Sequence, residues 1–227
     1  MNIWDWEFAW RIMPLLLDAV VITVYATVLG FVFAAVFAAV FGLVLALMRR
    51  SHRPWISLPT AAFVEFVRST PLLVQIYFLY FVLPEFGVLM PAIVAGILGL
   101  GLHFSTYCSE VYRAGLDGVP RGQWEAAVSL NMSRYRTYRD IVIPQAIPPV
   151  VPALGNYLVG MIKETPLLSS IAVVEVMQQA KIIGSETFRY IEPITLVGAF
   201  FLVVSLIAMM GIRRTEAWLR QKVLGSN

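Results

Sequence analysis

Five long apolar runs constrain this chain more than any other feature. A helix needs about 20 predominantly apolar residues to cross a hydrocarbon core of roughly 30 Å. Runs of this kind lie at about 15–47, 59–83, 91–111, 150–174 and 193–212. With 59% hydrophobic and 14% charged residues and a mean hydropathy of +0.77, the chain is not an ordinary soluble domain. We predict an all-α integral membrane protein with five transmembrane helices, in which residues 1–227 form a single transmembrane domain.

The first run, 15–47, is too long for one upright helix and too short for two spans with a connection. One long, tilted helix is therefore predicted. Residues 1–14 contain Asp5 and Glu7 but no basic segment typical of a cleaved signal peptide, so we expect them to be retained.

Basic residues gather on one side of the predicted spans. Basic loops resist translocation, so the richer side is cytoplasmic. This predicts an extracytoplasmic N-terminus at 1–14 and a cytoplasmic tail at 213–227. The net charge of +3 then reflects topology rather than binding to nucleic acid. The cytoplasmic side carries Arg49, Arg50, Arg53, Arg113, Arg121, Arg134, Arg136, Arg139, Arg213, Arg214, Arg220 and Lys222, against Arg11, Lys181 and Arg189 on the other side.

Motifs for catalysis, metal binding and nucleotide binding are missing. The sequence has no GxxxxGK[ST] phosphate loop, no HExxH and no GxSxG. Its single cysteine, Cys108, leaves no thiolate metal site, and His52 and His103 show no metal-ligand or triad spacing. We predict no enzyme activity, no metal site and no cofactor in this chain, so the energy for any work must come from elsewhere.

The longest polar stretch, 113–149, should project into the cytoplasm between the third and fourth spans. Its glycines and Pro120 should break the exit from the third span, and 123–130 favour a helix with Glu125 near the N-terminus. Small side chains follow Glu125 and would let a partner approach closely. From the residues alone, a solvated amphipathic helix explains this pattern more often than a docking element does.

A turn and a second helix should follow. Asn131 tolerates the left-handed conformation that closes many helices, and Ser133 can cap the next one. That second helix should reach Ile143 and end before Pro144.

At this point the sequence resembles a known family. Glu125-Ala-Ala, Asn131 and Ile141-Val-Ile-Pro144 resemble the EAA motif of bacterial ABC importer permeases, written EAA, three residues, G, nine residues, IxLP. Asn131 stands where glycine is usual and Ile143 where leucine is usual. The resemblance implies that the following residues couple the chain to an ATPase: Gly122, Gln123, Glu125, Ala126, Ala127, Asn131, Ile141 and Pro144.

Two further segments resemble the polar amino acid permeases within that family. Phe66-Val-Arg-Ser-Thr-Pro-Leu-Leu-Val-Gln75 is similar to FxRGTPLLxQ, with Ser69 in place of glycine. Lys163-Glu-Thr-Pro-Leu167 is similar to KDTSL, with Glu164 for aspartate and Pro166 for serine. Tyr107, Glu110, Arg113, Gly122 and Gln123 also fall at positions of this subfamily, and the resemblance extends from the first span to the C-terminus.

The resemblance implies a type I ABC importer (MetI-like) permease fold with a cytoplasmic coupling-helix loop at 113–149. It implies a chain embedded in the lipid of a bacterial inner membrane, paired with itself or a sister permease. Two ATPase subunits would bind ATP and Mg²⁺, and a periplasmic binding protein would deliver a polar amino acid or an amino-acid-like zwitterion. One branch of the subfamily handles ectoine or hydroxyectoine. The alternative is a stand-alone ion-coupled carrier or channel; an intramembrane enzyme ranks last.

Charged residues inside the predicted spans are costly unless paired and are usually functional. Arg68, Lys163 and Glu164 should lie near mid-bilayer, and Pro71 and Pro166 beside them should kink or unwind their helices. The residues predicted to form a substrate pathway or gate are Arg68, Thr70, Gln75, Tyr107, Glu110, Lys163, Glu164 and Thr165.

Two roles for these charges remain open at this stage. Arg68 or Lys163 could bind a substrate carboxylate while Glu164 binds its ammonium group. Equally, Arg68 could pair with Glu164 or Glu110 as a structural clamp or gate.

Overall fold

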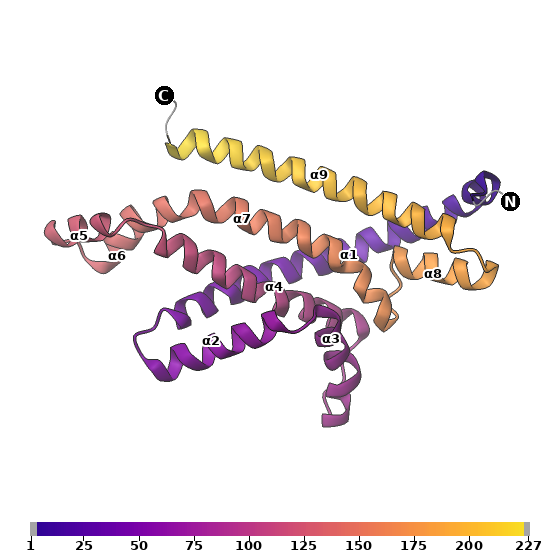
Figure 1. Ribbon diagram of the computed structural model, residues 1–227, viewed down its shortest axis with the longest axis horizontal. Coiled ribbons are helices and arrows are strands. Elements are labelled where there is room, and N and C mark those ends of the chain that lie inside the picture. Colours follow the sequence, from indigo (N-terminus) through magenta and orange to yellow (C-terminus); the bar gives the residue numbers. More distant parts are fainter. Residues whose placement is uncertain (1–3, 225–227) are drawn as a thin grey trace.

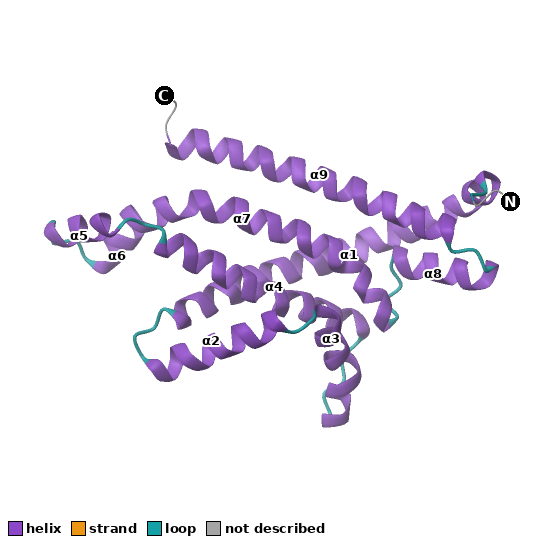
Figure 2. Ribbon diagram, in the orientation of Figure 1, coloured by secondary structure: helices purple, strands orange, loops and turns teal. Residues whose placement is uncertain are grey.

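The computed structural model describes residues 4–224, with side chains described outside 22–29, 219–220 and 222–224. Within that part every element is a helix, and the long helices run along the long axis of the molecule (Figures 1 and 2). Residues 1–3 and 225–227, and the side chains of Arg220 and Lys222, lie outside the described residues. The helices are α1 (Trp6–Arg49), α2 (Pro54–Ser69), α3 (Leu72–Tyr77), α4 (Ala92–Asp117), α5 (Arg121–Ser129), α6 (Arg134–Arg136), α7 (Ile143–Glu164), α8 (Val176–Thr187) and α9 (Ile191–Leu224); π-helical turns η1 (Phe78–Val82) and η3 (Thr137–Val142) and 3₁₀ turns η2 (Leu83–Phe86) and η4 (Thr165–Ile171) connect some of them.

Several of these stretches are long and apolar enough to cross a membrane. Among the described residues there are 4: Gly30–Arg49, Ala92–Asp117, Arg134–Ile171 and Ile191–Trp218. α2 and the helical stretch Leu72–Phe86 would make a fifth if the two, bent by 104°, form one broken span. The all-helical architecture is confirmed, whereas the count of five spans stays a prediction.

α1 and α4 pack closely at the centre of the molecule. Ala34, Ala38, Gly42 and Ala46 recur every fourth residue, so they share one face of α1. The three alanines are buried, and a Cβ added to Gly42 would lie 2.6 Å from the Ser105 carbonyl oxygen of α4. Small residues allow such close approach, which supplies the dispersion contacts that drive helix association in lipid. As predicted, the first apolar run is one helix.

Proline shapes the helices at two π-helical turns. Pro84 follows η1 and Pro144 follows η3, and in each case the residue four positions earlier lies inside the turn. Proline has no N–H to donate to that residue's carbonyl, and its ring clashes sterically with the same carbonyl. The wider π-helical turn accommodates both the missing hydrogen bond and the ring. The prediction that the second loop helix ends before Pro144 is therefore wrong, because the chain stays helical from α6 through η3 into α7.

The exit from the third run follows the prediction except at Gly115. α4 ends at Asp117, before Gly118 and Pro120, but it continues through Gly115. A Cβ at Gly115 would overlap the Val150 side chain and lie 3.3 Å from the Ala146 carbonyl oxygen. This glycine therefore permits α4 to cross α7 closely rather than breaking the helix.

The turn between α5 and α6 follows the sequence prediction. Asn131 has a φ of 50°, in the left-handed region, and closes α5. Ser133 precedes α6, and its side chain accepts a hydrogen bond from the Arg136 backbone N–H at 3.4 Å. Both local predictions are confirmed.

At the opposite end of the molecule, the N-terminal part of α1 packs against α8 and α9 (Figure 1). Phe8 and Ile12 are buried in this cluster. Nearby, the buried Glu192 carboxylate accepts hydrogen bonds from Arg189 and from the Asp5 backbone N–H, the latter at 3.0 Å. These contacts tie the start of α1 to the start of α9.

Candidate functional site

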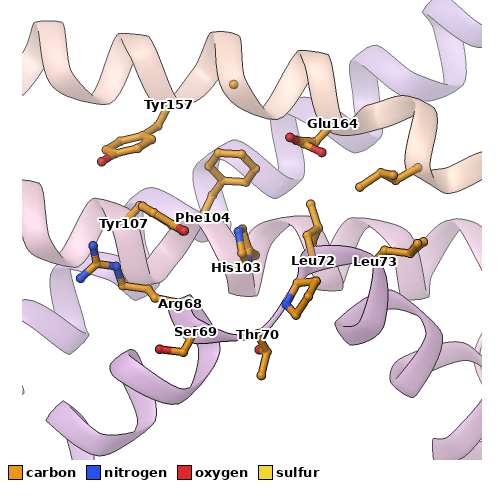
Figure 3. A pocket seen from close by; sticks show the side chains of 13 residues that line it. Arg68, Ser69, Thr70, Leu72, Leu73, His103, Phe104, Tyr107, Tyr157 and Glu164 are labelled. Atoms are coloured by element: carbon orange, nitrogen blue, oxygen red, sulfur yellow. The ribbon is translucent and has the colours of Figure 1, made fainter.

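A polar cavity of about 580 Å³ opens between the end of α2, the middle of α4 and the end of α7 (Figure 3). The α2–α3 break forms one side of it, where regular helix gives way to extended backbone. The cavity is lined by Arg68, Ser69, Thr70, Pro71, Leu72, Leu73, His103, Phe104, Tyr107, Tyr157, Gly160, Glu164 and Leu167.

Gln75 holds the α2–α3 break together. Pro71 has no N–H to give the Val67 carbonyl, and the Gln75 side-chain amide donates to that carbonyl instead, at 2.7 Å. The same amide reaches the carbonyl and hydroxyl oxygens of Thr70 at 3.1 and 2.7 Å. Gln75 Oε1 remains free to accept from His103 Nδ1, 3.2 Å away. The break predicted at Pro71 is confirmed, and the carbonyls of Val67 and Thr70 at the break find hydrogen-bond donors within the chain.

Arg68 lies between the cavity and a cluster of charges. Its guanidinium carbon lies 5.1 Å from the Tyr107 ring centroid, and Nη1 lies 4.0 Å from Glu110 Oε1. Glu110 also pairs with Arg49, and with Arg113 at 2.8 Å. Three arginines from α1, α2 and α4 thus converge on one carboxylate. Among the described residues, Arg68 Nε is buried without a hydrogen-bond partner.

Glu164 lines the cavity on α7. In Figure 3, Arg68 and Glu164 lie toward opposite ends of the cavity, with the rings of His103 and Phe104 between them. Glu164 forms no ion pair with the arginines and lysines that the structure describes, whereas Arg68 approaches Glu110. Lys163 is exposed and does not line the cavity. At Pro166 the α-helix tightens into η4, as expected for a proline beside the charges.

The predicted pathway residues therefore separate into two groups. Arg68, Thr70, Tyr107 and Glu164 line the cavity. The other four do not: Gln75 supports the helix break, Glu110 belongs to the arginine cluster, Lys163 is exposed, and the buried Thr165 donates to the Ile162 carbonyl at 2.6 Å.

Of the aromatic wall of the cavity, the sequence prediction included Tyr107 but not His103, Phe104 or Tyr157. Tyr107 contacts His103 and Tyr157, with ring centroids 5.1 and 5.3 Å apart, and Phe104 lies beside them. Helical spacing could have found these residues. His103 and Phe104 precede Tyr107 by four and three positions, and Tyr157 precedes Glu164 by seven, so each shares a helix face with a predicted residue.

The predicted coupling residues lie at the far end of the molecule from α8, on α5, η3 and the first turn of α7 (Figure 1). Glu125 and Ala126 are exposed on α5, but Ala127 is buried within the chain. Gln145 of α7 donates to Gln123 at 3.2 Å and ties α5 to α7. The predicted coupling residues found here are Gly122, Gln123, Glu125, Ala126 and Ala127 on α5, Asn131 in the turn, Ile141 in η3 and Pro144 at the start of α7.

Membrane-length helices around a polar cavity, with a broken helix at its edge, are typical of membrane proteins that move a polar solute. Irregular backbone and charged side chains within a membrane are tolerated where they line such a pathway or are covered by protein. Comparison with known proteins identifies the family. Residues 38–221 match the family described as the inner membrane component of binding-protein-dependent transport systems, and the chain belongs to it.

Individual relatives agree with this assignment. The chain is 45% identical over 206 residues to the probable amino-acid ABC transporter permease y4tG of Sinorhizobium fredii, covering 91% of this chain and 87% of that one. It is 31% identical to the glutamine transport system permease GlnP of Escherichia coli, over 97% and 99% of the two chains. A crystal structure of an amino acid ABC transporter with histidines superimposes with a TM-score of 0.85 at 35% identity, over 94% of this chain and 98% of that one. The resemblance to ABC importer permeases and their fold is confirmed.

Proposed function

We propose that this chain is the permease subunit of an ATP-driven importer that carries an amino acid or amino-acid-like zwitterion through the polar cavity by alternating access. The observation that carries the proposal is the cavity itself, which presents a guanidinium toward one end and, toward the other, a carboxylate that has no ionic partner among the side chains described. Relatives named for amino acids and glutamine support this substrate class. No observation favours a stand-alone carrier.

The two charges fit the two ends of a zwitterion. Arg68 can bind a carboxylate through its guanidinium, whose Nε has no partner among the described residues. Glu164 can bind the ammonium group. Glu110 already holds Arg49 and Arg113, and in our proposal it serves as the clamp that keeps α1, α2 and α4 together.

Glu164→Gln tests this assignment in the transporter reconstituted with its ATPase and binding protein. Removing the negative charge should weaken substrate affinity by about tenfold or more, as loss of a charge-assisted hydrogen bond costs roughly 1.5–3 kcal/mol. The matched control is Glu186→Gln, on the exposed face of α8, which should leave affinity unchanged. Unchanged affinity with altered basal ATPase activity in Glu164→Gln would assign this residue to a gate instead.

In our proposal the coupling loop docks on the separate ATPase, which binds ATP and Mg²⁺. α5 presents exposed Glu125, and the exposed apolar side chain of Val128, three positions on, shares its helix face, while exposed Leu130 follows the end of the helix. An exposed charge next to apolar side chains suits a partner cleft. α4 and α7 both line the cavity, and the loop that contains α5 connects them, so movement of α5 would reach both walls.

Charge reversal at Glu125 tests this docking. Glu125→Lys should insert normally yet lose substrate-stimulated ATP hydrolysis and uptake. Glu186→Lys, the same reversal at the opposite end, should retain both. Normal coupled transport in Glu125→Lys would count heavily against docking through α5.

Basic residues at one end of the molecule indicate its orientation. Arg49 ends α1, Arg50 and Arg53 lie in the connection to α2, and this connection is at the same end as α5 (Figure 1). This supports a cytoplasmic position for that end and an extracytoplasmic N-terminus.

A second permease copy or sister chain would complete the transporter, and a periplasmic binding protein would supply substrate. Thermal-shift screening of that binding protein with amino acids, ectoine and hydroxyectoine would identify the ligand, and co-purification would identify the second permease.

A further inference from the structure

A second cavity, of about 240 Å³, lies beside the polar one between α1, α4 and α7. Its walls are almost wholly apolar, in contrast to the polar cavity. The two cavities share two lining residues, Phe104 and Tyr157. The apolar cavity is lined by Ala35, Val36, Ala38, Ala39, Phe104, Cys108, Leu154, Tyr157, Leu158 and Met161.

The rings of Phe104, on α4, and Tyr157, on α7, both lie in the space between these two helices (Figure 3). Their ring centroids are 6.4 Å apart in an edge-to-face arrangement. Phe104 is 6% exposed, so its ring is held by its neighbours rather than free to swing. At Gly160 an added Cβ would lie 3.4 Å from Phe104 Cε1, which means that the ring leans onto the α7 backbone where a side chain is missing. The two rings form an aromatic partition between the cavities.

We propose that this aromatic partition, Phe104 backed by Tyr157, is a specificity determinant that limits the size of the apolar side chain a substrate can have. The inference rests on the proposed function, in which Arg68 and Glu164 hold the charged ends of a zwitterion. A substrate held between Arg68 and Glu164 presents its side chain to the other walls of the polar cavity. The partition keeps that side chain out of the apolar cavity. Truncating the partition would join the cavities and make the apolar walls available to that side chain.

The single cysteine reports directly on the partition. Cys108 lines the apolar cavity and is buried. A cationic, membrane-impermeant methanethiosulfonate enters from water, so in the reconstituted full chain it can use the polar cavity but cannot cross the lipid. We expect slow labelling in the unmodified chain and labelling faster by about tenfold or more in Phe104→Ala and Tyr157→Ala, because thiol reactivity follows access. Phe104→Leu, which loses less volume, should give a smaller acceleration.

The labelling experiment needs one matched variant and one test of folding. Phe33→Ala removes an exposed phenylalanine of α1 that lines neither cavity, and it should label as slowly as the unmodified chain. A cooperative unfolding transition identifies the variants that fold. Fast labelling of the unmodified chain, or no acceleration in whichever partition variants fold, would overturn the partition.

Substrate size is tested separately. Binding of alanine and norleucine to the purified complex is compared in the unmodified chain and in Phe104→Ala. The variant should gain affinity for norleucine relative to alanine by roughly tenfold, as expected for burying about two additional methylene groups. An unchanged preference alongside faster Cys108 labelling refutes the specificity role, whereas no amino acid binding to any form refutes the proposed function and leaves the labelling result standing.

Discussion

Replacing Gln75 by leucine would remove the amide that stands in for the missing N–H of Pro71. Leucine is close to glutamine in volume, so the substitution leaves no large cavity. It does leave the carbonyls of Val67 and Thr70 without the hydrogen bonds they receive at 2.7 and 3.1 Å. Val67 is 3% exposed, so water cannot readily replace the amide.

The magnitude follows from the hydrogen bonds that the Gln75 amide makes. Side-chain hydrogen bonds inside membrane proteins average about 0.6 kcal/mol, with a maximum near 1.7. The Val67 carbonyl keeps the hydrogen bond that it accepts from Thr70 Oγ1 at 3.1 Å, and Thr70 borders the cavity, where water can reach it. Loss of the Gln75 amide therefore predicts a loss of roughly 1–2 kcal/mol in the free energy of unfolding for Gln75→Leu.

Titration of the purified chain from mild detergent into dodecyl sulfate, followed by circular dichroism, measures this loss. Gln145→Leu is the matched control, because its amide is exposed and donates to Gln123 and to the Ile141 carbonyl. The control should stay within about 0.5 kcal/mol of the unmodified chain. A Gln75→Leu variant as stable as the control would refute the account of the helix break.

Three further substitutions probe other parts of the fold. Gly42→Ala should lower stability by roughly 1–3 kcal/mol because its Cβ would meet the α4 backbone, whereas Gly211→Ala, with open space around it, should be neutral or stabilising by unfolding temperature. Arg189→Met should lower the unfolding temperature because it strands the buried Glu192, and adding Glu192→Gln should recover part of the loss. Burial raises the pKa of Glu175, in the connection before α8, from 4.5 to about 7. The contribution of Glu175 to stability should therefore be full below about pH 4.5 and be lost as the pH rises through about 7, so the difference in stability between the unmodified chain and Glu175→Gln should change over this range.

Turns and caps that depend on one or two neighbouring residues were the easiest features to predict from the sequence. Asn131 and Ser133 act within one turn of their own positions, so residue preference alone placed the α5–α6 turn. Pro71 breaks its helix as predicted, although Pro59 and Pro152 lie inside α2 and α7 without ending them. The prediction that the helix ends before Pro144 was wrong because the preceding turn is π-helical, and such a turn accommodates the missing hydrogen bond.

Contacts between distant segments were less accessible. Glu110 and Arg49 are 61 positions apart, and only the packing of α1 on α4 brings them together. The small residues at every fourth position of α1, from Ala34 to Ala46, are a sequence signal for that packing. The rest of the aromatic wall around Tyr107 was missed because apolar and aromatic residues fill every span, so Phe104 stands out only once the face containing Tyr107 is known.

The central claim is that Glu164 binds the ammonium group of the substrate inside the cavity. Equilibrium binding of an amino acid and of its N-acetyl derivative, measured on the permease–ATPase complex for the unmodified chain and for Glu164→Gln, tests it most directly. Acetylation removes the ligand's charge, so the unmodified chain should prefer the free amino acid by about tenfold or more, and Glu164→Gln should lose most of that preference because the two changes remove the same interaction. Equal preference in both proteins would contradict the account and place the ammonium group elsewhere.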